Sequence, residues 1–339
     1  MYEKDGEKYF IVDSHLHFWV AIPANWNPGQ EEYAKGWIEC FHAYQGLGPP
    51  ETHWTLEHFY KCSEADLMKD VFEDGYVDVA IFQPTYLKEW YREGFNTTEQ
   101  DGALSEKHPG KFIVNTRFDP RDGDAGLKEL EENVARWGSK GVKLYTAEWR
   151  EGSRGYTLKD KASYQYLEKA QALGIKNIHV HKGPTIWPLD KDAFDVSDVD
   201  HAATDFPELN FIVEHVGLPR IEDFCFMATQ EPNVYAGMAV VIGGLMHARP
   251  RFFAKVVGEL LFWVGEDKMT FGSDYSIWEP KWQVEGFVDW DYPSDTEEFS
   301  DYPRVTTATK KKILGLNAAK LYGIDVPAEF QLPDGEATP

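Results

Sequence analysis

Short apolar runs alternate with longer amphipathic stretches along most of this chain, and polar or glycine- and proline-containing turns follow the runs. Interpreted as strands, the runs fall at residues 9–12, 77–82, 112–116, 141–145, 176–180, 211–213, 234–238 and 269–271. Residues 124–137 and 159–173 carry apolar side chains at three-to-four spacing, which predicts two crossover helices, the second closed by Gly174.

This alternation is typical of a parallel sheet whose neighbouring strands are joined by helices. A continuous series of eight such units favours a closed (β/α)8 (TIM) barrel, and an open doubly wound sheet is the alternative. Barrels of this kind often exceed about 250 residues as one unit. We therefore expect residues 1–339 to form a single α/β domain.

Two segments are too long to be simple connections. Residues 19–55 follow the first predicted strand and include four tryptophans, and residues 275–306 follow the eighth. Both come after the carboxyl end of a strand, which in a barrel lies at the catalytic face. We expect them to form lids, binding walls or subunit contacts, and surface decoration is the plainer alternative.

The charge and composition narrow the classes of partner. The chain has 34 Lys and Arg against 57 Asp and Glu, a net charge of −23, which repels nucleic-acid phosphates and anionic lipid. No stretch approaches about 18 uninterrupted apolar residues, and the three cysteines lack paired spacing. We therefore expect a cytoplasmic protein that binds a small molecule and neither nucleic acid nor membrane. Aromatic residues in the long segments favour a homo-oligomer, or a hetero-oligomer with a homologous subunit.

Histidines and a carboxylate fall at the carboxyl ends of predicted strands. His15 and His17 share one face of the first strand because side chains alternate, His181 ends the fifth strand, and Asp274 follows the eighth after Gly272. Imidazole and carboxylate suit Zn, Mn, Fe or Co. These ends meet at one face of a barrel, so the residues predict a divalent metal site in which Asp274 is a ligand or a general base.

Further polar residues on the strands have two interpretations each. His179 is a second-metal ligand or a hydrogen-bonded core histidine, and His215 binds metal or moves protons, while Glu214 is predicted to be structural, facing the helices or lying at a turn. Lys143, predicted to point inward with Tyr145, needs an ion pair, a substrate anion or carboxylation by CO2, which would make it a bridging ligand.

Residues for holding a substrate can also be suggested. Arg117 on the third predicted strand and Gln83 on the second could orient a substrate carboxylate by forked or amide hydrogen bonds, with Tyr145 beside them. An internal polar network is the alternative role for Arg117 and Gln83.

Together the motifs resemble the amidohydrolase superfamily, and within it the amidohydrolase 2 branch typified by aminocarboxymuconate semialdehyde decarboxylase and related nonoxidative decarboxylases and lactone hydrolases. The likeness spans about residues 9–325 and rests on Asp13-Ser-His-Leu-His, His181-Lys-Gly, Glu214-His-Val-Gly, Phe271-Gly-Ser-Asp-Tyr and Asn317-Ala-Ala-Lys-Leu-Tyr-Gly323. The resemblance implies that His15, His17, His181 and Asp274 are metal ligands and that His215 is the catalytic histidine.

His179, Lys143 and the aromatic segment 19–55 are not required by the mononuclear plan of that branch. With them the chain is similar to dinuclear iron/manganese oxygenases such as the catalytic subunit of 2-aminoisobutyric acid hydroxylase. The first hypothesis is therefore an O2-dependent hydroxylase with two Fe or Mn ions, acting on a small carboxylic or amino acid. The alternative is a mononuclear Zn or Mn decarboxylase or hydrolase in which Asp274 and His215 shuttle protons. A pseudoenzyme subunit is a third hypothesis, against which the retention of every expected ligand argues.

Overall fold

The computed structural model describes residues 1–152, 155–295 and 297–333. An antiparallel hairpin of β1 (Tyr2–Lys4) and β2 (Glu7–Tyr9) precedes the main body. The strands that follow pair in parallel and are β3 (Val12–Leu16), β4 (Val79–Phe82), β5 (Phe112–Val114), β6 (Thr116–Arg117), β7 (Gly141–Leu144), β8 (Asn177–His181), β9 (Asn210–Glu214), β10 (Val234–Gly237) and β11 (Met269–Thr270).

The strands close on themselves through two junctions. β3 to β5 form one parallel group and β6 to β11 another, and a single residue, Asn115, separates β5 from β6. At the other junction, Ser14 N donates to Phe271 O at 2.9 Å and Asp274 N donates to His15 O at 3.0 Å. The two groups therefore meet at both ends, as the predicted (β/α)8 barrel requires.

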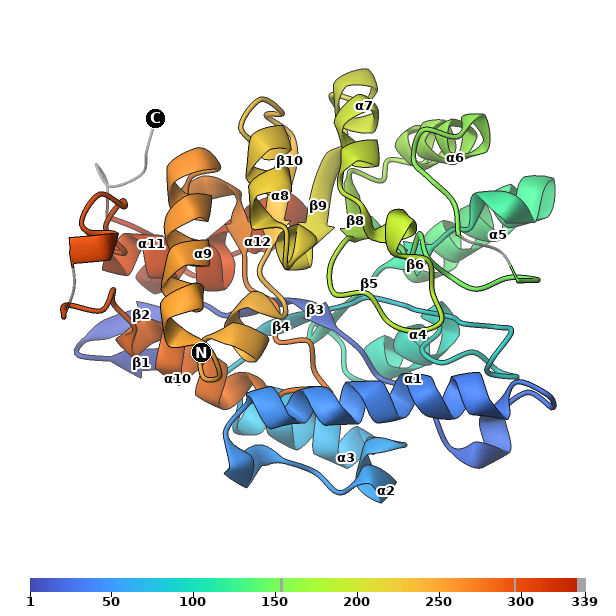
Figure 1. Cartoon of the computed structure of the whole chain (residues 1–339), viewed down its shortest axis with the longest axis horizontal. Coiled ribbons are helices and arrows are strands. Elements are labelled where there is room, and N and C mark those ends of the chain that lie inside the picture. Colours follow the sequence, from blue (N-terminus) through green and yellow to red (C-terminus); the bar gives the residue numbers. More distant parts are fainter. Residues whose placement is uncertain (153–154, 296, 334–339) are drawn as a thin grey trace.

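Helices connect most of the strands and surround them. Figure 1 shows α5 to α9 around the strands, while α1 lies across another side with α2 and α3 beside it. The described α-helices are α1 (Glu31–Tyr44), α2 (Leu56–Phe59), α3 (Glu64–Leu67), α4 (Thr98–Lys107), α5 (Gly123–Trp137), α6 (Lys161–Ala172), α7 (Ser197–Asp205), α8 (Ile221–Ala228), α9 (Pro250–Trp263), α10 (Pro280–Asp289), α11 (Thr307–Lys311) and α12 (Asn317–Tyr322), and short 3-10 and π helices lie between them. Helices α5 and α6 confirm the predicted helices 124–137 and 159–173. Across the described residues, no helix combines the length and apolar character needed to span a bilayer.

Alternation along the strands separates an apolar layer from a polar interior. Val142, Val180 and Val213 belong to the apolar core between strands and helices, as expected for a parallel sheet buried on both faces. Between them, the register pairs Lys143 with His179, and His181 with Glu214. The polar residues of β7, β8 and β9 therefore lie at matching positions along the strands, on the inner side of the sheet.

The first predicted strand has the wrong bounds, whereas the other seven overlap β4 to β11. Tyr9 belongs to β2, and β3 runs over Val12–Leu16. The polar residues of β3 are buried because they bond to the far end of the chain: Asp13 accepts from Ser273 N at 2.9 Å and from Ser273 Oγ at 2.5 Å. A search for apolar runs does not detect a strand of this kind.

Candidate metal centre

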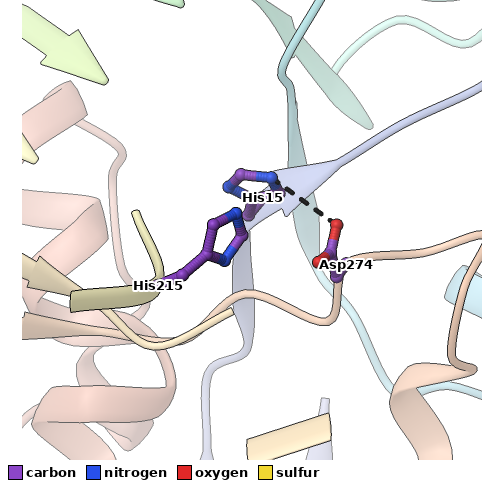
Figure 2. A group of neighbouring side chains, drawn as sticks. All are labelled: His15, His215 and Asp274. Atoms are coloured by element: carbon purple, nitrogen blue, oxygen red, sulfur yellow. Dashed lines mark ion pairs between the residues drawn. The ribbon is translucent and has the colours of Figure 1, made fainter. Parts of the chain in front are cut away.

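Three donor atoms meet where β3 and β11 end. His15 Nε2 lies 3.1 Å from His17 Nε2 and 3.6 Å from Asp274 Oδ1, and His17 Nε2 lies 3.5 Å from the same oxygen. Figure 2 shows His15 and His215 side by side, with Asp274 reaching His15 from the segment after β11. Ligands about 2.1 Å from one ion are roughly 3.0 to 3.4 Å apart, so this spacing fits a divalent ion.

Local backbone structure brings Asp274 to His15. Gly272 passes so close that a Cβ there would lie 2.5 Å from His15 Cβ, which explains the glycine in Phe271-Gly-Ser-Asp. Asp274 itself has φ of 59°, an uncommon value for a residue other than glycine. The hydrogen bonds between Asp13 and Ser273 join β3 to the segment after β11 next to these residues. The chain thus holds Asp274 in a costly conformation that places its carboxylate beside the two imidazoles.

His215 and His181 complete the group. One ligand atom from each of His15, His215 and Asp274 lies within 4.8 Å of the others. His215 Nδ1 lies 3.0 Å from the carbonyl oxygen of Ala239, so Nδ1 carries a hydrogen and Nε2 has a free lone pair. His181 Nδ1, 3.2 Å from His215 Nε2, then acts as donor.

This arrangement leaves a lone pair on His181 Nε2, which is buried and has no hydrogen-bond partner among the described residues. Unpaired buried nitrogens are rare and call for an explanation. A metal ion bound by His15, His17, His181 and Asp274 would supply the missing partner, and the donor set is the one that Zn and Mn accept. The residues present therefore fit a divalent metal.

Glu214 is a correction to the sequence analysis, which assigned it a structural place toward the helices or at a turn. It is fully buried inside the strands, with Oε2 2.8 Å from His15 Nδ1 and Oε1 2.5 Å from His179 Nδ1. The inward residues of β9 are thus the even-numbered ones, and His215 reaches the site through its positive φ of 65°. Gly183 accommodates it, since a Cβ there would lie 2.5 Å from His215 Cβ.

His179 is hydrogen bonded at both ring nitrogens. Besides Glu214, its Nδ1 lies 3.1 Å from Gln83 Nε2, and its Nε2 lies 2.6 Å from the hydroxyl of Tyr322. This geometry matches the core-histidine alternative better than a role as a second-metal ligand. Gln83 belongs to the same buried network, because its amide also donates to Ser14 O at 2.7 Å.

Arg117 is also held inside the protein. Its guanidinium lies 3.6 Å from Glu148 and 3.7 Å from Asp122, and 4.1 Å above the ring of Tyr86. It does not line the pocket described below. The internal polar network, rather than a substrate carboxylate, therefore accounts for its charge.

Two further residues support His17 and were missed from the sequence. Asn96 Oδ1 lies 3.4 Å from His17 Nδ1, and Asn96 Nδ2 donates to Asp101 Oδ1 at 2.7 Å. Asn96 and Asp101 are both fully buried. Neither follows a strand end directly, so the rule that located the other site residues gave no signal for them. They orient His17 as hydrogen-bond partners commonly orient metal-binding histidines.

Burial dominates the ionisation of the group. It lowers the pKa of His17 to about 3 and also lowers the pKa of His15, so both rings are neutral. Burial raises the pKa of Asp274 to about 7, with Lys143 opposing it. Burial lowers the pKa of Lys143 to about 8, and its Nζ lies 3.5 Å from His15 Nε2. Neutral imidazoles are the form that binds metal.

A narrow pocket with a cavity volume of about 30 Å³ lies beside these donors. Its walls are mainly apolar and include three side chains of α1, which belongs to segment 19–55; the lining consists of His17, Trp37, Phe41, Tyr44, Thr85, Phe95, Tyr145, His181, Pro184, Ile186, His215, Val240, Asp274 and Ile277. The buried Tyr145 hydroxyl has no hydrogen-bond partner among the described residues. Tyr145 is thus free to bond to a ligand, and no Lys or Arg of the described chain lines this pocket.

Both long segments contribute residues to the wall of the pocket. Segment 19–55 contributes a pocket wall through α1, and segment 275–306 contributes Ile277 and contains α10. Residue 296 of the second segment lies outside the described residues. Their roles as lids or subunit contacts remain predictions.

Comparison with known proteins gives a family match and a set of similar folds. The family model described as "Amidohydrolase" matches residues 12–324. No curated protein matches this chain.

Three of the similar solved structures cover nearly the whole chain. An uncharacterised TIM-barrel protein from Bordetella bronchiseptica has a TM-score of 0.65 at 17% identity, covering 92% of this chain and 98% of that one. An amidohydrolase from Burkholderia multivorans with bound zinc has a TM-score of 0.62 at 14% identity, covering 93% and 100%. A 5-carboxyvanillate decarboxylase from Novosphingobium aromaticivorans with bound manganese has a TM-score of 0.58 at 15% identity, covering 93% and 97%. At these identities the likeness shows the fold alone.

Proposed function

This chain belongs to the amidohydrolase family, and on that premise we propose that it is a mononuclear Zn- or Mn-dependent enzyme that removes CO2 from a small carboxylic acid without oxidation. Hydrolysis at the same site is the related alternative. The observation that carries the proposal is the close approach of His15, His17 and Asp274 beneath a pocket that His181 and His215 also line. The fold likeness to the zinc-bound amidohydrolase and the manganese-bound decarboxylase supports it.

His15, His17, His181 and Asp274 would hold the ion. When bound, it would supply a Lewis acid toward the oxygen atoms of the substrate. No Lys or Arg of the described chain lines the pocket, so no side-chain cation would balance the negative charge of the substrate there. Tyr145 is placed to donate its unpaired hydroxyl to a substrate oxygen.

Decarboxylation breaks a C–C bond and forms a C–H bond at the same carbon, so one proton must be delivered to that carbon. His215 lines the pocket, its Nδ1 is fixed by Ala239 O, and its Nε2, which accepts from His181 Nδ1, is the nitrogen that would take up and release the proton. The aromatic walls from Trp37, Phe41 and Phe95 exclude water and disfavour a carboxylate relative to neutral CO2.

The test separates metal binding from proton transfer. We expect about one Zn or Mn per chain, and CO2 release from at least one member of a panel of small aromatic and aliphatic acids. His181→Ala should lose the metal and the activity, whereas His215→Ala should keep the metal and lose about 100-fold or more in kcat. His201→Ala, an exposed position on α7, is the matched control and should change neither. Full activity of His215→Ala would contradict the assigned role.

One observation keeps the dinuclear hydroxylase as a second candidate. Lys143 is buried with Nζ 3.5 Å from His15 Nε2, and carboxylation by CO2 would turn it into a bridging ligand. Against it, both nitrogens of His179 have hydrogen-bond partners. Two redox-active ions per chain with substrate-dependent O2 uptake would favour the hydroxylase, and one ion without O2 uptake would exclude it.

A further inference from the structure

A line of buried polar groups runs from the last helix of the barrel to the metal centre. Tyr322, at the end of α12, is buried and places its hydroxyl 2.6 Å from His179 Nε2. Asn115, the residue between β5 and β6, donates from Nδ2 to the same hydroxyl oxygen at 2.9 Å. His179 Nδ1 lies 2.5 Å from Glu214 Oε1, and Glu214 Oε2 lies 2.8 Å from His15 Nδ1.

The chemistry of these groups gives the line a single direction. The Glu214 carboxylate can only accept, so His179 Nδ1 carries the ring hydrogen and donates it to Glu214 Oε1. His179 Nε2 is then the accepting nitrogen and takes the hydroxyl hydrogen of Tyr322 at 2.6 Å, while Asn115 Oδ1, the other acceptor near that hydroxyl, lies 3.2 Å away. The other oxygen of Glu214 lies 2.8 Å from His15 Nδ1, which favours the ring hydrogen on Nδ1 and leaves the lone pair on His15 Nε2.

That lone pair is the one that faces the other donors. His15 Nε2 is the atom that lies 3.1 Å from His17 Nε2 and 3.6 Å from Asp274 Oδ1. If His15 carried its hydrogen on Nε2 instead, the ring could not bind an ion there. The state of His15 thus depends on Glu214, and through it on His179 and Tyr322.

We propose that Tyr322, His179 and Glu214 form a positioning column that fixes the tautomer and ring orientation of the metal ligand His15. The inference rests on the proposed metal-dependent function. It assigns Tyr322, His179 and Glu214 the role of orienting one metal ligand, His15. Tyr322 and His179 touch neither the pocket nor the cluster of donors, so they act only through Glu214 and His15. The last helix of the barrel is thereby coupled to metal affinity.

The main test measures metal affinity in Tyr322→Phe, which removes the hydroxyl and keeps the ring. The dissociation constant of the purified full chain for Zn²⁺, and separately for Mn²⁺, is measured by competition with a chromophoric chelator, and thermal unfolding is followed on the metal-free protein. Groups that orient a metal-binding histidine typically change affinity by about 10- to 100-fold. We expect that range for Glu214→Gln and, because Tyr322 is two groups further away, a loss of about 3- to 10-fold for Tyr322→Phe.

Tyr166→Phe is the matched control. Tyr166 is also a buried tyrosine, on α6. Its hydroxyl donates to Gly123 O at 2.6 Å, and this hydrogen bond involves no residue of the column. It should lower thermal stability without changing metal affinity. Equal metal affinity for Tyr322→Phe, Tyr166→Phe and the unchanged protein would overturn the column and leave Tyr322 a packing residue.

A pair of substitutions at position 179 adds a rescue test. The amide of His179→Gln can still accept from Tyr322 and donate to Glu214, whereas His179→Leu can do neither. Metal affinity should fall clearly more in His179→Leu than in His179→Gln, and equal losses would overturn the column. A wild-type chain that binds neither metal would instead refute the proposed function, so the two failures are distinguishable.

Discussion

Gly272 and His15 are in direct steric contact: a Cβ at position 272 would lie 2.5 Å from His15 Cβ and 3.3 Å from His15 N. Gly272→Ala should therefore displace His15 from Asp274 and weaken metal binding, with a loss of about 1 to 3 kcal/mol in the free energy of unfolding. Urea denaturation and chelator competition measure the two effects. Gly46→Ala, at an exposed position with no atom within 4 Å of the added Cβ, should change both very little. An unaltered metal affinity in Gly272→Ala would argue against the contact.

Asn96 should matter for the metal although it is not a ligand. Asn96→Ala removes the contact with His17 Nδ1 and leaves Asp101 without its amide donor. We expect metal affinity to fall by about 10- to 100-fold. Asn233→Ala is the control, because Asn233 Nδ2 bonds to backbone oxygens of residues 203, 206 and 209, and it should cost stability alone. If both variants keep wild-type metal affinity, Asn96 does not orient His17.

Metal affinity should fall on acidification. Burial raises the pKa of Asp274 to about 7 in the metal-free protein, and only the ionised carboxylate binds the ion. Affinity is therefore greatest above that pKa and decreases by up to about tenfold for each pH unit below it. His15 and His17 do not compete near neutral pH, because burial lowers the pKa of both.

Calorimetry in buffers of different ionisation enthalpy checks this prediction by counting released protons. At about pH 6 we expect close to one proton per bound ion, and at about pH 8.5 far fewer. A dissociation constant that is flat across this range would show that Asp274 is already ionised before the metal binds.

Lys182 should serve stability and not metal binding. Its Nζ is fully buried and lies 2.8 Å from Asp198 Oδ1, and it also donates to Ala193 O at 2.9 Å. Lys182→Met leaves the buried Asp198 without its cation and should cost about 3 to 5 kcal/mol in the free energy of unfolding.

The double variant with Asp198→Leu should recover part of that loss, since replacing a buried pair costs less than breaking it. The recovery is incomplete because Asp198 also accepts from Leu158 N at 3.0 Å. Denaturant unfolding measures both variants, and metal affinity in each should equal that of the unchanged chain. A single variant as stable as the wild type would show that the pair contributes little.

The barrel and the clustering of the candidate donor residues could be predicted because both follow from local rules. Apolar runs located most strands, and the carboxyl ends of parallel strands share one face, so His15, His17, His181 and Asp274 could be expected together. All four line or contact the same pocket or cluster.

The partners of those donors could not be predicted in the same way. Glu214 was misplaced because the alternation of side chains was continued through His215, whereas His215 turns inward through its positive φ and the register pairs His181 with Glu214. Tyr322 lies in the late motif Asn317-Ala-Ala-Lys-Leu-Tyr, but nothing local shows that its hydroxyl reaches His179. Arg117 has the chemistry of a substrate clamp, and only the fold reveals that Glu148 and Asp122 lie beside it.

The junction of β3 with the segment after β11 also has a consequence for the synthesis of the chain. His15 and His17 leave the ribosome early, whereas Asp274 and its neighbour Ser273 are among the later residues to emerge. Until Asp274 is synthesised, the nascent chain carries the imidazoles of His15, His17 and His181 but not the carboxylate of the proposed site. On the proposed metal-dependent function, a fragment that ends before residue 274 should hold the cation more weakly than the full chain.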